Sequence, residues 1–343
     1  MNGERNQQQP QQTQLHGGSP GRHRQPDGAA TSEAEFTSYY GRPVVKEAPW
    51  EIDIPIYLFT GGLAAGSALL AAGGDLTGRP ALRRIGRFAS AGALSASVAA
   101  LVHDLGRPSR FLHMLRVVRL TSPMSVGSWL LTLHGSVAGT ATLAEIAGML
   151  PTRARRGPVR LLGHLDRGLG VVSALTAPPL AAYTAVLLSD TATPSWHTAY
   201  EELPFVFVGS AATASGGLMM IGAPPGQTGP ARAVAAGGAA LELVAEKRME
   251  RSMGIAAEPL HKGTAGRWMR ASKILTAAGA VGSLLAGKNR LVSALSGAVL
   301  MVGSACTRFG IFEAGQASAR DPKYTVVPQR ERLDEGQPVR YQP

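Results

Sequence analysis

The chain has 343 residues and a formal net charge of +11, yet only 17% of its residues are charged, against about 25% in an average soluble domain. Its single cysteine, Cys306, excludes a disulfide framework and a cysteine-ligated iron–sulfur cluster within the chain. The basic residues lie in short clusters between apolar runs, which is typical of membrane-protein loops and disfavours nucleic-acid binding.

Two polar tails flank a hydrophobic body. Residues 1–38 are rich in Gln, Pro, Gly and Ser and have too few large apolar residues to bury a core, so we expect a disordered N-terminal tail. Residues 316–343 have a similar character and are predicted to form a polar C-terminal tail. Residues 39–315 are predicted to form one membrane domain. Its first apolar segment begins only near Ile52, too far into the chain for a secretory signal peptide.

The body contains about eight apolar segments, most of them near the roughly 20 residues that cross a bilayer as a helix. In none of them do apolar and polar residues alternate with a period of two, and this disfavours a β-barrel. We therefore predict an all-α integral membrane protein with about eight transmembrane helices, in the plasma membrane. Basic residues occur in loops on both sides of the predicted spans and indicate no orientation. The segments are 52–74, 85–105, 126–150, 166–189, 203–223, 230–246, 271–287 and 291–313.

Ionisable residues gather where the second segment ends, in the stretch LVHDLGRPSRF (101–111). His103 and Asp104 occupy the predicted last turn, and a glycine and a proline follow that would end the helix. A carboxylate there opposes the helix dipole, so we expect Asp104 to pair with Arg107 or Arg110. Two interpretations are open: an ion pair that anchors the helix end, and a site that moves protons.

The following residues, RFLHMLRVVRL (110–120), predict a short amphipathic helix that lies in the membrane interface. Its basic residues are Arg110, Arg116 and Arg119, of which the last two share one side with His113. They would contact anionic lipid or a soluble partner subunit, and we regard them as partner-docking candidates. The TSPMSVGSW stretch (121–129) then turns the chain into the third span, with Ser122 or Ser125 as a helix cap.

The starts of the first and third spans and the end of the second share one membrane face, by the count of spans. Asp53 and Tyr57 at the first span could therefore meet His103, Asp104 and Arg107. A histidine or carboxylate there can move protons, and a tyrosine hydroxyl can hydrogen-bond a carbonyl.

Other polar residues lie inside the predicted spans. His134 in the third span and Glu242 in the sixth are candidates for a proton path. His103 and His134 together raise the alternative of a haem held between two helices, but their predicted depths differ. A structural or proton-path role is therefore favoured for His134. Glu145 and Glu246 are expected near helix ends, solvated or paired.

Three stretches carry a family resemblance. They are YYGRPVVKEAPWEIDIPIYLFTGGLAAGSALLAAGGDLTGR (39–79), HDLGRPSRFLHMLRVVRLTSPMSVGSW (103–129) and RFGIFEAGQASARDP (308–322). The chain resembles the NrfD-type membrane subunits, also called the polysulfide reductase membrane subunit family, from about Tyr39 to Asp321.

The resemblance implies eight helices in two four-helix bundles and a quinone, menaquinone or ubiquinone, bound non-covalently near one membrane face. It implies electron transfer to an iron–sulfur, ferredoxin-like subunit that serves a molybdopterin-type catalytic subunit, as in anaerobic respiration. It also implies no haem in this chain. The family binds the quinone head through a polar side chain at the start of the first span. Some members have histidine there, and Tyr57 matches that position by alignment on GGLAAG. Asp104, Arg107 and Arg110 match the pattern after the second span.

The resulting hypothesis is a quinone-interacting membrane anchor of an oxidoreductase complex. Tyr57 would hydrogen-bond the head group, His103 and Asp104 would exchange protons, and Arg107 would keep Asp104 charged. Two alternatives are a transporter or channel without redox chemistry, for which Gly-rich breaks and buried carboxylates argue, and a passive tether for a catalytic subunit.

Overall fold

A computed structural model describes residues 43–107, 109–151 and 157–334. Throughout this part of the chain the regular elements are helices, as predicted, and each of the eight apolar segments overlaps a long helix. The predicted N-terminal tail, residues 1–38, lies outside the described residues, as do residues 335–343 of the predicted C-terminal tail.

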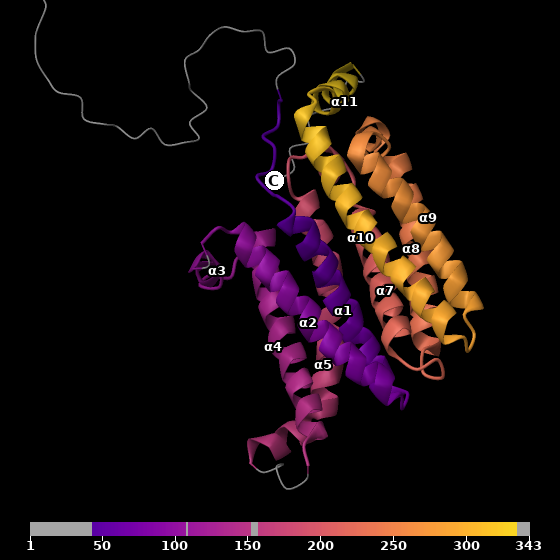
Figure 1. Cartoon of the computed structure of the whole chain (residues 1–343). Coiled ribbons are helices and arrows are strands. Elements are labelled where there is room, and N and C mark those ends of the chain that lie inside the picture. Colours follow the sequence, from indigo (N-terminus) through magenta and orange to yellow (C-terminus); the bar gives the residue numbers. More distant parts are fainter. Residues whose placement is uncertain (1–42, 108, 152–156, 335–343) are drawn as a thin grey trace, which may run out of the picture. The chain divides into compact units, whose positions relative to one another are not determined.

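Four of the long helices form a first helix set: α1 (Asp53–Leu76), α2 (Pro80–Asp104), α4 (Pro123–Met149) and α5 (Pro158–Ser189). Three of them begin with proline, which fits the first turn because its missing N–H would have no helical partner there. Within this set α1 packs mainly against α2 and α5, and α4 packs mainly against α5 (Figure 1).

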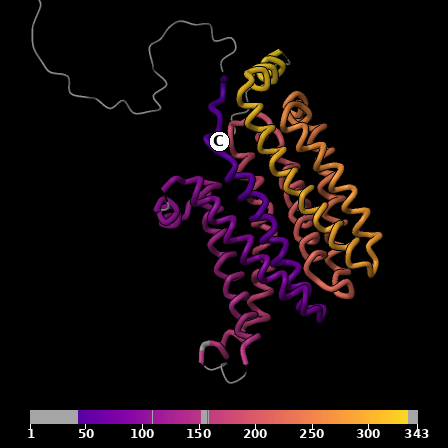
Figure 2. The backbone as a smooth tube through the Cα atoms, in the orientation of Figure 1, coloured from indigo at the N-terminus to yellow at the C-terminus, as the bar shows by residue number. Residues whose placement is uncertain are grey.

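The other long helices form a second helix set: α7 (Leu203–Gly222), α8 (Gly229–Ser252), α9 (Gly263–Leu285) and α10 (Arg290–Arg320). Here α7 packs against α8 and α10, and α9 packs against α10. A Cβ atom on Gly217 of α7 would lie 2.5 Å from the Gly297 carbonyl oxygen of α10, so these two backbones touch. Contacts of α7 with α1 and α5 join the sets, and α1 runs between α2 and α7 (Figure 2).

Successive long helices run antiparallel, so one end of the body collects the starts of α1, α4, α7 and α9 and the ends of α2, α5, α8 and α10 (Figure 1, top). We call this the cavity end. Gln316 near the end of α10 donates from Nε2 to the carbonyls of Ala48 and Trp50, each at 3.1 Å, which ties both sets together before α1 begins.

Short helices cap the cavity end: α3 (Ser109–Met114), α6 (Pro194–Thr198), η2 (Gly254–Leu260) and α11 (Lys323–Asp334). The predicted interfacial helix over 110–120 is wrong in its extent, because α3 ends at Met114. The β-branched Val117 and Val118 disfavour a helix. In addition, Ser125 Oγ donates to the Val117 carbonyl and accepts from the Arg119 N–H, which holds this segment as a loop.

Helical structure extends beyond residue 315, the expected end of the membrane domain. α10 continues to Arg320, and α11 covers residues 323–334 of the expected tail. The continuation is stabilised by packing, since Ser318 is buried and its Oγ accepts from the Ser195 N–H at 3.1 Å. A segment that looks polar in sequence is therefore partly built into the folded body.

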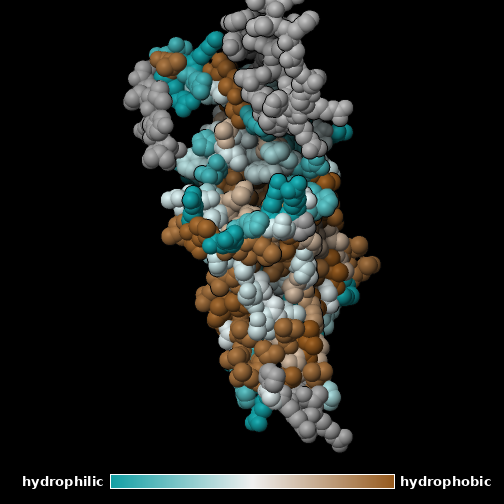
Figure 3. All heavy atoms as spheres, turned by 90° about the vertical axis from the view of Figure 1, so that its left-hand side faces the viewer, coloured by the Kyte–Doolittle hydropathy of each residue, from teal (hydrophilic) through white to brown (hydrophobic). Residues whose placement is uncertain are grey.

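Within the part of the chain that the structure describes, five helices are long and apolar enough to cross a membrane: α1, α2, α5, α7 and α10. The remaining long helices, α4, α8 and α9, are of similar length but less apolar or more charged. On the face shown in Figure 3, hydrophobic and neutral residues cover most of the surface, and strongly hydrophilic residues gather toward the two ends. This pattern is that of a multi-pass membrane protein.

Candidate functional site

A cavity of about 170 Å³ opens at the cavity end of the first helix set. Its walls come from α1, α2, α4 and α5 and are mostly apolar, with Ile54, Leu101 and Leu131 among them. Polar groups enter this apolar space from Tyr57, Asp104, Ser128 and Tyr183, and from Arg110. Apolar walls with a few directed polar groups are the usual composition of a small-molecule site.

Tyr57 lies about one turn inside α1 and is only 3% exposed. Its backbone carbonyl accepts a hydrogen bond from Ser97 Oγ of α2 at 3.3 Å, which holds α1 and α2 in register at this depth. The phenol lines the cavity. Sequence reasoning selected this residue for its depth, and the fold places it in a cavity wall.

Tyr183 of α5 also lines the cavity, although its place in the sequence indicates only an interface or packing role. Its ring fits because position 127 of α4 is glycine: a Cβ atom there would lie 1.8 Å from Tyr183 Cζ. The glycine of the TSPMSVGSW stretch therefore makes room for the second phenol. A signal was present in the prolines Pro178 and Pro179, which remove two helical N–H donors about one turn earlier.

The end of α2 differs from expectation in its pairing. Asp104 lines the cavity, but it forms no ion pair with either arginine. Arg110 instead donates from Nη1 to the Leu105 carbonyl at 3.1 Å, an orphan acceptor of the α2 terminus, and Arg107 is exposed. Arg110 thus binds the backbone at the end of α2, and the Asp104 carboxyl lines the cavity without an ion-pair partner.

His103 and Asp53 meet beside the cavity rather than in its wall. His103 Nδ1 lies 2.8 Å from Asp53 Oδ2, and the histidine side chain is 81% exposed. The pair joins the first turn of α1 to the last turn of α2. The residues predicted to meet thus form two groups. Tyr57 and Asp104 lie in the cavity wall, and His103 and Asp53 pair at the surface.

The basic residues expected to dock a partner are at the surface. Arg110, Arg116 and Arg119 are all exposed, and the neighbouring Leu112 and Leu120 are 65% and 84% exposed. Ser122, one of the two predicted caps, accepts from the Ser125 N–H and begins α4. Residues 110–120, which we call the α3 loop, therefore present cations and large apolar side chains together.

His134 is fully buried one turn deeper in α4 than the cavity wall at Leu131. Its Nδ1 lies 2.8 Å from Thr176 Oγ1 of α5, and no described residue bonds its Nε2. His103 and His134 thus lie in different surroundings, one exposed and bonded to Asp53, the other enclosed, which disfavours a haem shared between them.

The opposite end of the first helix set contains an ion-pair cluster. Arg87 is 4% exposed and pairs with Glu145 at 3.1 Å and with Asp166. Arg83 joins Glu145 to Asp75. The expectation of paired carboxylates here is confirmed, and Glu145 is moreover buried. Glu246, for which the same was expected, pairs with Lys273 at 3.6 Å and is completely buried in α8, one turn from the equally buried Glu242.

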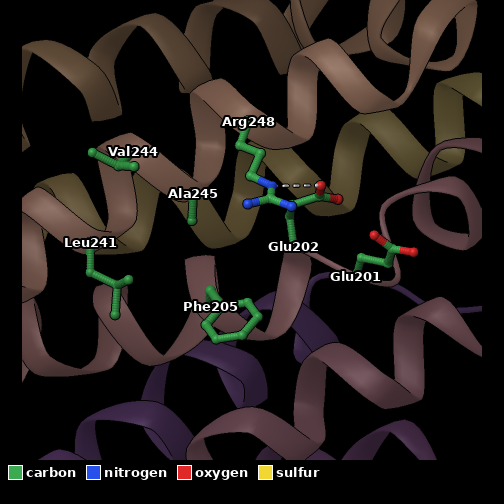
Figure 4. A pocket seen from close by; sticks show the side chains of 7 residues that line it. All are labelled: Glu201, Glu202, Phe205, Leu241, Val244, Ala245 and Arg248. Carbon is green, nitrogen blue, oxygen red and sulfur yellow. Dashed lines mark ion pairs between the residues drawn. The ribbon is translucent and has the colours of Figure 1, made fainter.

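A larger hollow of about 400 Å³ lies at the cavity end between α7 and α8 (Figure 4). Glu202 there is already satisfied, by Arg248 Nε at 3.5 Å and by Ser252 Oγ at 3.0 Å. Phe205 and Val244 are more than half exposed on its walls. This open, apolar hollow with paired charges resembles lipid-facing surface more than an enclosed site, so the smaller cavity is the better candidate.

Comparison with known proteins agrees with this architecture. The family model described as polysulphide reductase, NrfD, matches residues 44–224, more than half of the chain, and spans α1 to α7 with the whole cavity. A search of curated proteins found no match. The chain therefore belongs to the polysulphide reductase NrfD family.

Proposed function

We propose that this chain is the quinone-interacting membrane subunit of an oxidoreductase complex. It would carry electrons between the membrane quinone pool and an iron–sulfur subunit that serves a molybdopterin-type enzyme. The observation that carries the proposal is the cavity in which two phenols and a carboxyl face apolar walls. Membership of the NrfD family supports a membrane anchor role.

The cavity residues fit a quinone head group. Pockets for drug-sized ligands begin at about 300 Å³, so a cavity of about 170 Å³ suits a single ring and excludes a long tail. Met124 in its wall is 52% exposed, so the cavity opens toward the surface of α4, where an isoprenoid tail would lie against lipid. Apolar walls exclude water, and the hydroxyls supply hydrogen-bond donors.

Each cavity residue would then have a separate role in quinol oxidation. A quinol that gives two electrons to the iron–sulfur partner also releases two protons. Tyr57 and Tyr183 would donate hydrogen bonds to the quinone oxygens and orient the ring. Asp104, with no arginine paired to it, would accept the two protons one after the other at its carboxylate and pass each to the His103–Asp53 pair at the surface. The exposed arginines of the α3 loop, beside the cavity, would contact the partner subunit.

The first test is purification in mild detergent, followed by mass spectrometry of proteins and extracted lipids. Co-purified quinone, a ferredoxin-like subunit and a molybdopterin-type subunit are expected. A lone, intact chain without quinone would overturn the proposal in favour of a transporter, for which flux assays would be the next step.

Substitutions then test the cavity in the intact complex. We expect Asp104→Asn to lower quinol-linked turnover by about 10²-fold, the usual scale of a lost general base. Tyr57→Phe should raise KM about fivefold, equivalent to one neutral hydrogen bond of about 1 kcal/mol. Tyr200→Phe is the matched control, since that hydroxyl bonds Glu201 at the surface. Normal turnover in both cavity variants would support the passive tether.

A further inference from the structure

A column of ionisable side chains runs into the second helix set from the cavity end. Glu242, Glu246 and Glu250 follow one another at four-residue spacing, so they share one face of α8. Glu242 and Glu246 are completely buried, and the Glu250 side chain is 18% exposed. Lys273 of α9 links the outer two, with Nζ 2.6 Å from Glu250 Oε1 and 3.6 Å from Glu246 Oε1.

The inner end of the column meets α10. Thr307 Oγ1 donates to Glu242 Oε1 at 2.5 Å and also lies 2.5 Å from Ser272 Oγ. Thr307 Oγ1 also lies 3.2 Å from the Gly303 carbonyl, and when Glu242 is ionised the one proton of Thr307 can go to Glu242 while Ser272 donates to Thr307. The next residue, Arg308, is 1% exposed, donates Nη2 to the Phe207 carbonyl at 2.7 Å and stacks on the Phe207 ring.

Several buried atoms of this column have no hydrogen-bond partner among the described residues. They are Oε2 of Glu242, both carboxylate oxygens of Glu246, of which Oε1 has only its ion pair with Lys273, and Nε and Nη1 of Arg308. Burying an ionised oxygen without a partner costs several kcal/mol, on the order of 2–7 even for neutral polar groups. Polar cavities commonly meet this cost with internal water, and carboxyls meet it by binding a proton.

The charges of the column do not balance. The groups that face it are the three carboxylates of Glu242, Glu246 and Glu250, against two cations, Lys273 and Arg308. The exposed His261 adjoins the outer end of the column, with Nε2 3.9 Å from Glu250 Oε2. One added proton would make the five buried and half-buried groups neutral.

We propose that Glu242 and Glu246 together hold one exchangeable proton, and that Glu250 and Lys273 connect this proton to the cavity end of the membrane. Glu242 was a proton-path candidate from sequence, and the other members come from the fold. The proton moves between carboxylate oxygens and water, and no electron transfer is involved. The proposal is independent of whether the chain binds quinone.

Infrared spectroscopy of the purified chain tests this directly. The wild type at neutral pH should show the carbonyl stretch of a protonated carboxylic acid, which shifts in D₂O as the proton exchanges. The band should disappear in Glu242→Gln/Glu246→Gln. It should persist in Glu145→Gln, the matched control, because Glu145 is equally buried but bonded to arginines.

The connection is tested by the rate of that shift. Lys273→Met should slow the exchange of the band at least tenfold, whereas Lys262→Met, on the exposed surface, should leave it unchanged. Should Lys273→Met fold poorly, Glu250→Gln serves the same purpose. A wild type without the band, a band that survives the double substitution, or an exchange rate indifferent to Lys273 and Glu250 would each overturn the proposal.

Discussion

The two helix sets bury carboxylates in opposite ways. In the first set Glu145 is surrounded by Arg83, Arg84 and Arg87, and none of its oxygens is left without a partner among the described residues. In the second set Glu242 and Glu246 are buried as deeply but retain unpartnered oxygens. A buried acid that is fully paired stabilises an arrangement, whereas one that is incompletely paired is suited to gain and lose a proton.

The largest expected effect comes from breaking the paired region. Arg87→Met removes the most buried cation of the cluster and leaves Glu145 and Asp166 to the more exposed Arg83 and Arg84. We expect a loss of about 3–5 kcal/mol in the free energy of unfolding, measured by equilibrium unfolding in detergent micelles. Arg84→Met is the control, because Arg84 pairs with the same Glu145 but is 53% exposed, and it should cost at most about 1 kcal/mol. Equal losses would show that burial is not what distinguishes the cluster.

A smaller effect should separate the two kinds of glutamate. Glu145→Gln removes the charge that the arginines require, and we expect a cost of about 1.5–3 kcal/mol, the scale of hydrogen bonds to charged groups. Glu242→Gln keeps an acceptor for Thr307 and removes an unpartnered ionisable oxygen. Its unfolding free energy should therefore change by less than about 1 kcal/mol. A loss at Glu242 as large as that at Glu145 would contradict the contrast between the sets.

The smallest effect concerns exposed charges at the edge of the second set. Hydrogen bonds from Lys262, the larger effect, and from Lys323 lower the pKa of Glu258 from 4.5 to about 2. Because the folded-state pKa is depressed, this contribution is complete above pH 4.5 and is lost as pH falls toward 2.

Lys323 lies in α11, so the protection of α11 amides, expressed relative to their intrinsic exchange rate at each pH, should fall as the pH is lowered through that window and stay constant above pH 5. Lys323→Ala should flatten the dependence. An unchanged profile in that variant would assign the transition to another group.

The positions of the helices were predictable because apolar runs of membrane length have few other conformations available. The meeting of Tyr57 and Asp104 followed from counting the spans. What failed depended on local competition: Arg110 bonds a backbone carbonyl instead of Asp104, and Ser125 holds residues 117–119 in a loop.

The residues that sequence reasoning missed lie on helix faces whose direction only packing decides. Tyr183 faces the cavity because α4 has a glycine opposite it. Glu246 is buried because α8 turns the face with three glutamates toward α9 and α10, where an end-of-helix acid would ordinarily meet solvent. The four-residue spacing from Glu242 was visible, but spacing alone does not say which side of a helix is covered.

The column of Glu242, Glu246 and Glu250 also spans part of the transmembrane voltage. Glu242 and Glu250 are eight residues apart on α8, about 12 Å at 1.5 Å per residue, in a hydrocarbon layer about 30 Å thick. A proton moved along that distance crosses about 40% of the transmembrane voltage, which corresponds to about 0.9 kcal/mol for each 100 mV. The occupancy of the buried carboxyls would thus change several-fold with membrane potential. The second helix set would in this way respond to the energised state of the membrane, whatever occurs in the cavity of the first.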